Sequence, residues 1–166
     1  MGYTIYFKNK VKQTDEDWNE FIIACKKLYK NMPKEIDGKV LSISGCSKAE
    51  KPIFNNNHVW FNGSDGEKRI KEGKYWKDST DKELEHETFV LSKKPCHESC
   101  KTNRKPYTFM VMAVLILAKT MLKDIHFLDA GAEWQDSLVY VNEVCRNNKT
   151  FTLLMFPDKL KENLFD

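Results

Sequence analysis

The side chains best suited to chemistry are concentrated in the segment CKTNRKPY, residues 100–107. Its three cations are Lys101, Arg104 and Lys105, and the hydroxyl group of Thr102 stands among them. Arginine supplies a planar pair of donors, lysine a compact positive charge and threonine a neutral donor, and phosphate oxygens accept hydrogen bonds from all three. The segment therefore predicts a site that binds an anion.

The same segment leads directly into the most apolar run of the chain, residues 109–118, with Pro106 suited to the first position of a helix. A helix start carries unpaired N–H groups and the positive end of the dipole, so it favours an anion and disfavours cations by roughly a few tenths of a kcal/mol each. Two interpretations stay open. The cations bind a phosphate, or they face solvent and the carboxylates of Glu85, Glu87 and Glu98.

A second polar group, His86-Glu87-Thr88, stands at the beginning of an expected strand. Histidine and a carboxylate can form an acid–base pair or contribute metal ligands. Neighbouring residues of a strand point to opposite faces, so His86 and Thr88 share a face and Glu87 does not. We expect His86 and Thr88 to hydrogen-bond a ligand, and the alternative is a half-exposed strand start without a ligand.

Cys96, His97 and Cys100 resemble one half of a zinc site. A closed structural site needs four ligands, and the sequence holds no second pair with this spacing. We therefore expect a loop with a buried cysteine and an exposed histidine, and no metal or other cofactor. The sequence also contains no Walker A loop and no G-x-G-x-x-G, G-x-S-x-G or H-E-x-x-H motif, so it predicts no catalytic residues.

Length and composition predict a single globular domain over residues 1–166, with 41% hydrophobic and 12% aromatic residues. The net charge of +3 is too small for a dedicated nucleic-acid domain, so an anion site would be local. An odd number of scattered cysteines and a first decapeptide without signal-peptide character predict a cytoplasmic protein. The apolar run at 109–118 is shorter than the roughly 20 residues that span a bilayer.

The elements that must position these residues indicate an α+β fold, with a mixed or antiparallel sheet of about four or five strands and about three helices on one side. Residues 106–122 are apolar almost all round and predict a central core helix. A capping box at Thr14 and Asp17 predicts a helix over 15–31, and a third helix is expected over 133–146. Strands are expected at 3–7, 40–44, 58–61, 88–91 and 126–128.

The connections are read from turn residues and polarity. Asn62-Gly63 predicts a turn after the strand at 58–61, followed by a long and mobile surface loop over 62–83. Pro95 begins a second polar connection, and the apolar residues 151–156 are either a strand or a short helix.

Three motifs together carry a resemblance to a known group of proteins: WFNG at 60–63, HETF at 86–89 and CKTNRKPY at 100–107. They resemble a widespread family of small phage and bacterial proteins, and are similar to phage-encoded sponges that blunt CBASS antiviral signalling by sequestering cyclic nucleotides. The resemblance covers about a third of the chain, residues 60–118. It implies a homo-oligomer, a dimer or tetramer, that holds a cyclic dinucleotide such as 3′3′-cGAMP in the host cytoplasm. No polymeric nucleic acid or membrane is implied as a partner.

The resemblance also suggests which residues contact the ligand. Those expected at phosphate are Lys101, Thr102, Arg104, Lys105 and Tyr107, and those expected at phosphate or base are His86 and Thr88. Thr108 stands where the pattern has an aspartate after the tyrosine, which removes an acid from the segment and suits it further to an anion.

Two classes of function follow from these residues. The first is non-catalytic binding and sequestration of a cyclic dinucleotide, which inhibits host signalling. The alternative is a phosphoesterase or another enzyme acting on a nucleotide, with His86 as acid or base and with Arg104 and Lys105 stabilising developing charge. A third reading is an inhibitor that contacts another protein through 62–83.

Overall fold

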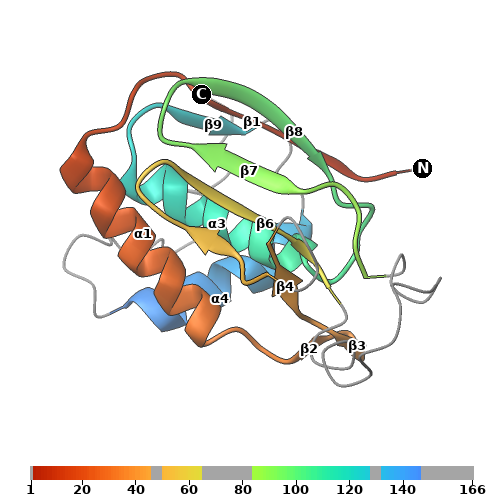
Figure 1. Ribbon diagram of the computed structural model, residues 1–166. Coiled ribbons are helices and arrows are strands. Elements are labelled where there is room, and N and C mark those ends of the chain that lie inside the picture. The colour runs from red at the N-terminus through yellow and green to blue at the C-terminus, as the bar shows by residue number, and fades with distance from the viewer. Residues whose placement is uncertain (1, 46–49, 65–83, 128–131, 147–166) are drawn as a thin grey trace.

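The computed structural model describes residues 2–45, 50–64, 84–127 and 132–146. Within these residues the chain has the expected α+β fold, with antiparallel strands and three α-helices. The apolar helix α3 (Thr108–Met121) lies behind β6 (His58–Gly63) and β7 (Phe89–Ser92), with α1 (Asp15–Lys30) and α4 (Gln135–Cys145) beside it (Figure 1). Among the residues described, no helix combines the length and the apolar character that a membrane crossing requires.

The strands pair in three groups. Strand β1 pairs with β8 and β9, β2 pairs with β3, and β6 pairs with β4, β5 and β7. Every pairing is antiparallel. The strands are β1 (Thr4–Asn9), β2 (Glu35–Ile36), β3 (Lys39–Val40), β4 (Ile43–Ser44), β5 (Ile53–Phe54), β6 (His58–Gly63), β7 (Phe89–Ser92), β8 (Cys96–Lys101) and β9 (Ile125–Phe127).

Buried aromatic rings join the group around β1 to the group around β6. The ring of Phe89 lies 5.3 Å from that of Phe7 and 5.1 Å from that of Phe61, measured between centroids. All three side chains are buried. Strand β7 also lies next to β8. Just before β7, the N–H of Glu87 donates to the carbonyl of Lys101, at the end of β8, over 3.3 Å. Through these contacts the two groups of strands share one hydrophobic core.

The helices confirm the local signals of the sequence. They are α1 (Asp15–Lys30), α3 (Thr108–Met121) and α4 (Gln135–Cys145), and the 3₁₀ turn η2 (Ala132–Trp134) leads into α4. The Thr14 hydroxyl accepts from the N–H of Asp17 over 3.0 Å, which is the predicted cap of α1. Helix α3 begins at Thr108, so Pro106 lies two residues before it and not at its first position.

Two predictions about strands were wrong. The expected strand at 40–44 is divided between β3 and β4, because β3 pairs back onto β2 through a tight turn in which Asp37 and Gly38 have φ of 51° and 71°. Strand β6 does not turn at Asn62-Gly63 but continues through both, because they pair with Ser44 and Ile43 of β4.

The polar segment after Pro95, expected to be a connection, is strand β8. It pairs with β1 along all six of its residues, and its exposed side chains account for its polar sequence. Residues 65–83 of the predicted loop and the apolar residues 151–156 lie outside the described part of the chain.

Candidate functional site

The side chain of Asn62 on β6 connects the first motif to the second. Its Nδ2 donates to the carbonyl of His86 over 2.8 Å and to the hydroxyl of Thr88 over 3.3 Å. Its Oδ1 accepts from the N–H of His86 over 3.3 Å and from that of Gly63 over 2.7 Å. The Asn62 amide, which sequence reasoning did not select, therefore links the main chain of His86 to the hydroxyl of Thr88. Strand β7 begins only at Phe89, so the shared face of the two side chains stays a prediction.

Glu87 connects the second motif to the third. Its carboxylate accepts from the N–H of Lys101 over 2.7 Å. Its main-chain carbonyl accepts from the hydroxyl of Tyr107 over 2.7 Å and from the thiol of Cys100 over 3.4 Å. Glu87 precedes β7, so its bonds go to the next segment and not across the strand. It was considered from the sequence as a carboxylate partner of the cations, and in the structure it bonds to the main-chain N–H of Lys101.

The cations lie on a tight turn between β8 and α3. The N–H of Lys105 donates to the carbonyl of Thr102 over 3.0 Å, and Asn103 and Arg104 have φ of 51° and 55°, as in a type I′ turn. Asparagine tolerates this conformation, whereas in arginine it costs about 1–2 kcal/mol. The fold therefore holds Arg104 in a conformation that its sequence does not favour.

Two contacts hold the guanidinium of Arg104. It lies 4.7 Å from the centre of the Tyr3 ring. Its Nε and Nη2 both donate to Oε1 of Glu133, each over 3.1 Å. Glu133, and none of the three glutamates considered from the sequence, is the partner of this arginine. One of the three predicted cations therefore already has a counter-ion.

The start of α3 has fewer unpaired donors than a regular helix start. The N–H groups of Thr108, Phe109 and Met110 donate to carbonyls three residues earlier, over 2.9, 3.1 and 3.0 Å. This corrects the premise that free N–H groups would receive the anion. An anion at this turn would be held by side chains, with Lys101 exposed and Lys105 half-buried and free of any ion pair with the described residues.

Several buried polar atoms near the turn have no hydrogen-bond partner within the described part of the chain. They are Oγ1 of Thr102, Oγ1 of Thr108 and Nδ1 of His86. An unsatisfied buried group costs about 1–3 kcal/mol, so native proteins keep few of them without a use. Two of the three belong to residues that the sequence assigned to a ligand.

Tyr107 has a different place from that expected. Its side chain is buried, and its hydroxyl is used in the bond to Glu87. Burial raises its pKa, and burial raises the pKa of the neighbouring Cys100 thiol to about 12. Both groups therefore stay protonated at neutral pH and act as internal donors.

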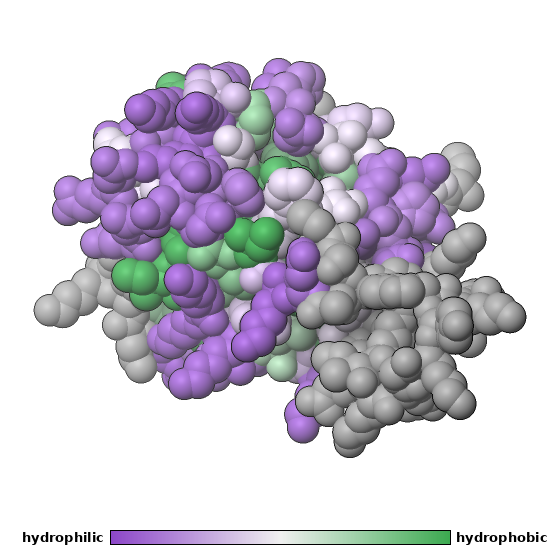
Figure 2. All heavy atoms as spheres, viewed as in Figure 1, coloured by the Kyte–Doolittle hydropathy of each residue, from purple (hydrophilic) through white to green (hydrophobic). Residues whose placement is uncertain are grey.

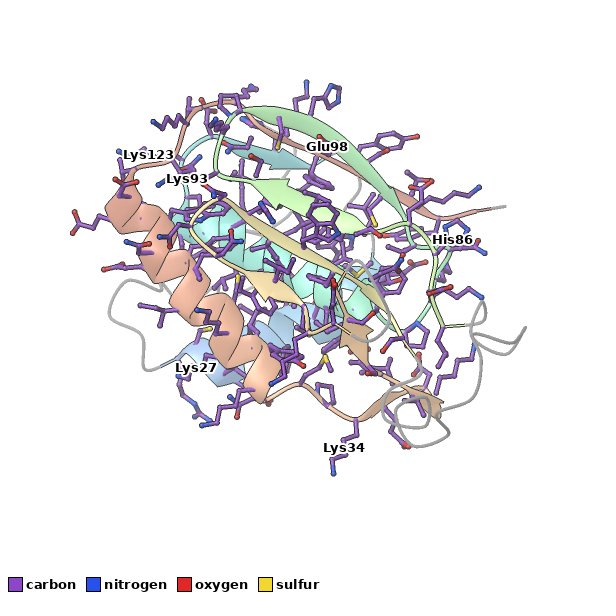
Figure 3. All side chains as sticks on the ribbon, viewed as in Figure 1. Lys27, Lys34, His86, Lys93, Glu98 and Lys123 are labelled. Atoms are coloured by element: carbon purple, nitrogen blue, oxygen red, sulfur yellow. The ribbon has the colours of Figure 1, made fainter. Side chains whose placement is uncertain are left out.

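The carboxylate of Glu98, considered from the sequence as a partner of the cations, lies away from His86 (Figure 3). His86 lies at the end of the molecule that carries the N-terminus, whereas Glu98 lies beside the middle of β8 (Figure 3). In the extended strand β8, Cys96 and Cys100 are about 13 Å apart. His97 points to the face of the strand opposite to that of Cys96 and Cys100. Among the residues described, no three His, Cys, Asp or Glu side chains are placed to share a metal ion.

Comparisons with protein-family models, with curated proteins and with solved structures found no match to this chain. The geometry of the three motifs and the resemblance they carry are therefore the grounds for a functional proposal.

Proposed function

We propose that this protein binds a cyclic dinucleotide and holds it without cleaving it, at the turn formed by residues 101–105. The observation that carries the proposal is the left-handed conformation of Arg104. Strained residues persist where the surrounding structure fixes them, and they are concentrated at binding sites. Here the strained residue carries its guanidinium to the ring of Tyr3 and the carboxylate of Glu133, on a turn whose sequence neighbours are lysines.

The charge of the turn supports an anionic ligand. Lys101, Arg104 and Lys105 supply three positive charges, against the two nearby carboxylates of Glu133 and Glu87. The turn therefore keeps a net positive charge, and each phosphate of a dinucleotide ring carries one negative charge. The unpaired hydroxyl of Thr102 adds a neutral donor at the same turn.

The chemistry of the neighbouring groups supports retention over cleavage. The thiol of Cys100 and the phenol of Tyr107, which flank the turn in the sequence, are buried and protonated. Nδ1 of His86 is buried and has no hydrogen-bond partner among the described residues, whereas a general base is normally oriented by a third group. In this proposal the protein acts in the host cytoplasm, and sequestering the nucleotide inhibits antiviral signalling. Two or more copies of the chain together enclose the ligand.

One experiment tests this function directly. The purified protein is incubated with 3′3′-cGAMP, separated from free ligand, denatured, and the released compounds are analysed by mass spectrometry. Intact ligand supports sequestration. Linear product shows hydrolysis, and absence of any retained nucleotide rejects binding of this ligand class.

Replacing Arg104 with glutamine is expected to weaken binding of the cyclic dinucleotide by about 1.5–3 kcal/mol, or roughly tenfold to a hundredfold in Kd. The substitution removes a charge-assisted donor, and titration calorimetry measures the loss. Arg146→Gln, at the exposed end of α4, is the control that removes the same charge away from the turn. Equal affinities of the two variants would contradict the role of Arg104.

Replacing Thr102 with valine is expected to stabilise the free protein by about 1 kcal/mol and to weaken ligand binding. Valine has nearly the same shape, and it removes a buried hydroxyl that has no partner. Ser137→Ala is the matched control, because the Ser137 hydroxyl donates to the carbonyl of Phe109 over 3.0 Å and its loss should destabilise. Denaturant unfolding with and without ligand gives both quantities. A destabilised Thr102→Val variant would show that the hydroxyl already has a partner.

A further inference from the structure

The strands β1, β8 and β9 present one face toward the core and one toward solvent. Ile5, Phe7 and Asn9 of β1 are buried, so the residues between them point outward with the residues paired to them. The outward set is Thr4, Tyr6 and Lys8 on β1, Lys101, Ser99 and His97 opposite them on β8, and His126 opposite Lys8 on β9.

This outward face has an unusual charge balance. The whole chain has nearly equal numbers of acidic and basic residues, 24 and 27. None of the outward positions in β1, β8 and β9 carries a carboxylate, whereas two carry lysine and two carry histidine. Figure 2 shows hydrophilic residues gathered over β8 at the top of the molecule. The face is complementary to an anion.

Three carboxylates border the face: Glu98 of β8, which is exposed opposite Phe7, and Glu87 and Asp124, which have partners. Glu87 accepts from the N–H of Lys101. Asp124 lies 2.9 Å from Nε2 of His126, and this contact lowers the pKa of the Asp124 carboxyl. The ammonium groups of Lys8 and Lys101 form no ion pair with the described residues.

Tyr6 interrupts this hydrophilic face with an aromatic ring. Its side chain is 47% exposed, and it is the one aromatic residue among the large hydrophobic residues exposed in the described part of the chain. Solvent-facing sides of antiparallel sheets are normally polar, so an exposed ring between cations is a departure that suits a stacked base.

The spacing on the two strands suits a nucleotide. Successive outward residues of a strand are about 7 Å apart. Tyr6 therefore stands about 7 Å from the row that contains Lys101 and about 7 Å from the row that contains Lys8, on opposite sides. Lys101 belongs to this face and also begins the turn that carries Arg104, so the face continues the site described above.

We propose that a base of the bound nucleotide stacks on the ring of Tyr6, with phosphate held at Lys101 on one side and at Lys8 on the other. This inference rests on the proposed function, because it extends the same site along β1. It makes Tyr6 and Lys8 binding residues that no sequence motif indicated.

The test uses a cyclic dinucleotide in which one base is the fluorescent analogue 2-aminopurine, whose emission is quenched by stacking on an aromatic ring. Tyr6→Thr keeps a strand-forming residue and removes the ring, and it is expected to lose the quench and weaken Kd about tenfold to a hundredfold. Tyr6→Phe keeps the ring and should behave as the wild type. Val40→Thr, an exposed strand position on β3, is the matched control.

Lys8→Gln tests the second half of the inference independently of the ring, with Lys26→Gln on the exposed side of α1 as its control. We expect weaker binding and a smaller salt dependence for Lys8→Gln only. Unchanged binding by Tyr6→Thr or by Lys8→Gln, together with weakened binding by Arg104→Gln, would overturn this inference and leave the proposed function standing. A wild-type protein that binds no cyclic dinucleotide overturns both.

Discussion

Replacing Gly63 with alanine is expected to destabilise the protein by about 3 kcal/mol or more. A Cβ atom at this position would overlap the carbonyl oxygen of Leu84 and lie 2.7 Å from Cδ1 of Tyr107. Neither neighbour can move freely, because Leu84 presents main chain and the buried Tyr107 is held by its bond to Glu87. Gly63 is therefore a point at which β6, the main chain at Leu84 and the side chain of Tyr107 approach closely, and denaturant unfolding measures the effect.

Gly38→Ala is the control for the loss of a glycine alone. Gly38 has φ of 71° and no atom within 4 Å of an added Cβ, so alanine there should cost about 1 kcal/mol through backbone strain only. If Gly63→Ala were no more destabilising than Gly38→Ala, the main chain at Leu84 would have to be able to yield, and the tight contact of Gly63 with Leu84 and Tyr107 would be refuted.

The fold class was predictable because its signals are local. The cap at Thr14, the apolar period of α1 and the apolar run of α3 each depend on residues close together in the chain. Strand β8 was missed because its polar sequence gains strand structure only from β1, about 90 residues earlier. The turn at Asn62-Gly63 was wrong for the same reason, because pairing with β4 overrides a local preference.

The sequence predicted which segments form the candidate site much better than it predicted which contacts each residue makes there. The sequence indicated that residues 60–63, 86–89 and 100–107 matter, and the structure brings these three segments together. It could not indicate that Asn62 and Glu87 join them, since hydrogen bonds between distant segments leave no periodic pattern. Nor could it distinguish the buried Tyr107 from the exposed Lys101, since both adjoin the same basic run.

The far end of the sheet depends on one buried amide. Asn9 of β1 is 1% exposed, and its Nδ2 donates to the carbonyls of Ser92, Lys93 and Lys94 over 3.0, 3.3 and 3.1 Å. Its Oδ1 accepts from Nε2 of Gln13 over 2.8 Å. This amide ties β1 to the turn between β7 and β8, at the end where Figure 3 shows Lys93 and Lys123, away from His86.

Replacing Asn9 with aspartate is expected to cost about 3–5 kcal/mol at pH 7. The side chain keeps its shape, but a carboxylate oxygen replaces the donor and faces three carbonyl oxygens in a buried place. Asn9→Leu is the neutral control, because it also removes the donor and adds no charge. Unfolding free energies of the two variants at a series of pH values separate the lost hydrogen bonds from the buried charge.

The pH dependence of Asn9→Asp follows from that burial. Burial beside carbonyl oxygens should raise the pKa of the introduced carboxyl in the folded state above the roughly 3.9 of the unfolded chain. The folded state then binds the proton more tightly, so the extra cost is smallest below about pH 4, grows as pH rises, and becomes constant above the folded-state pKa. A cost that is the same at pH 4 and pH 7, as expected for Asn9→Leu, would mean that water reaches the carboxylate. In that case β1 and the turn between β7 and β8 would separate at this end, and Asn9 would not hold them together.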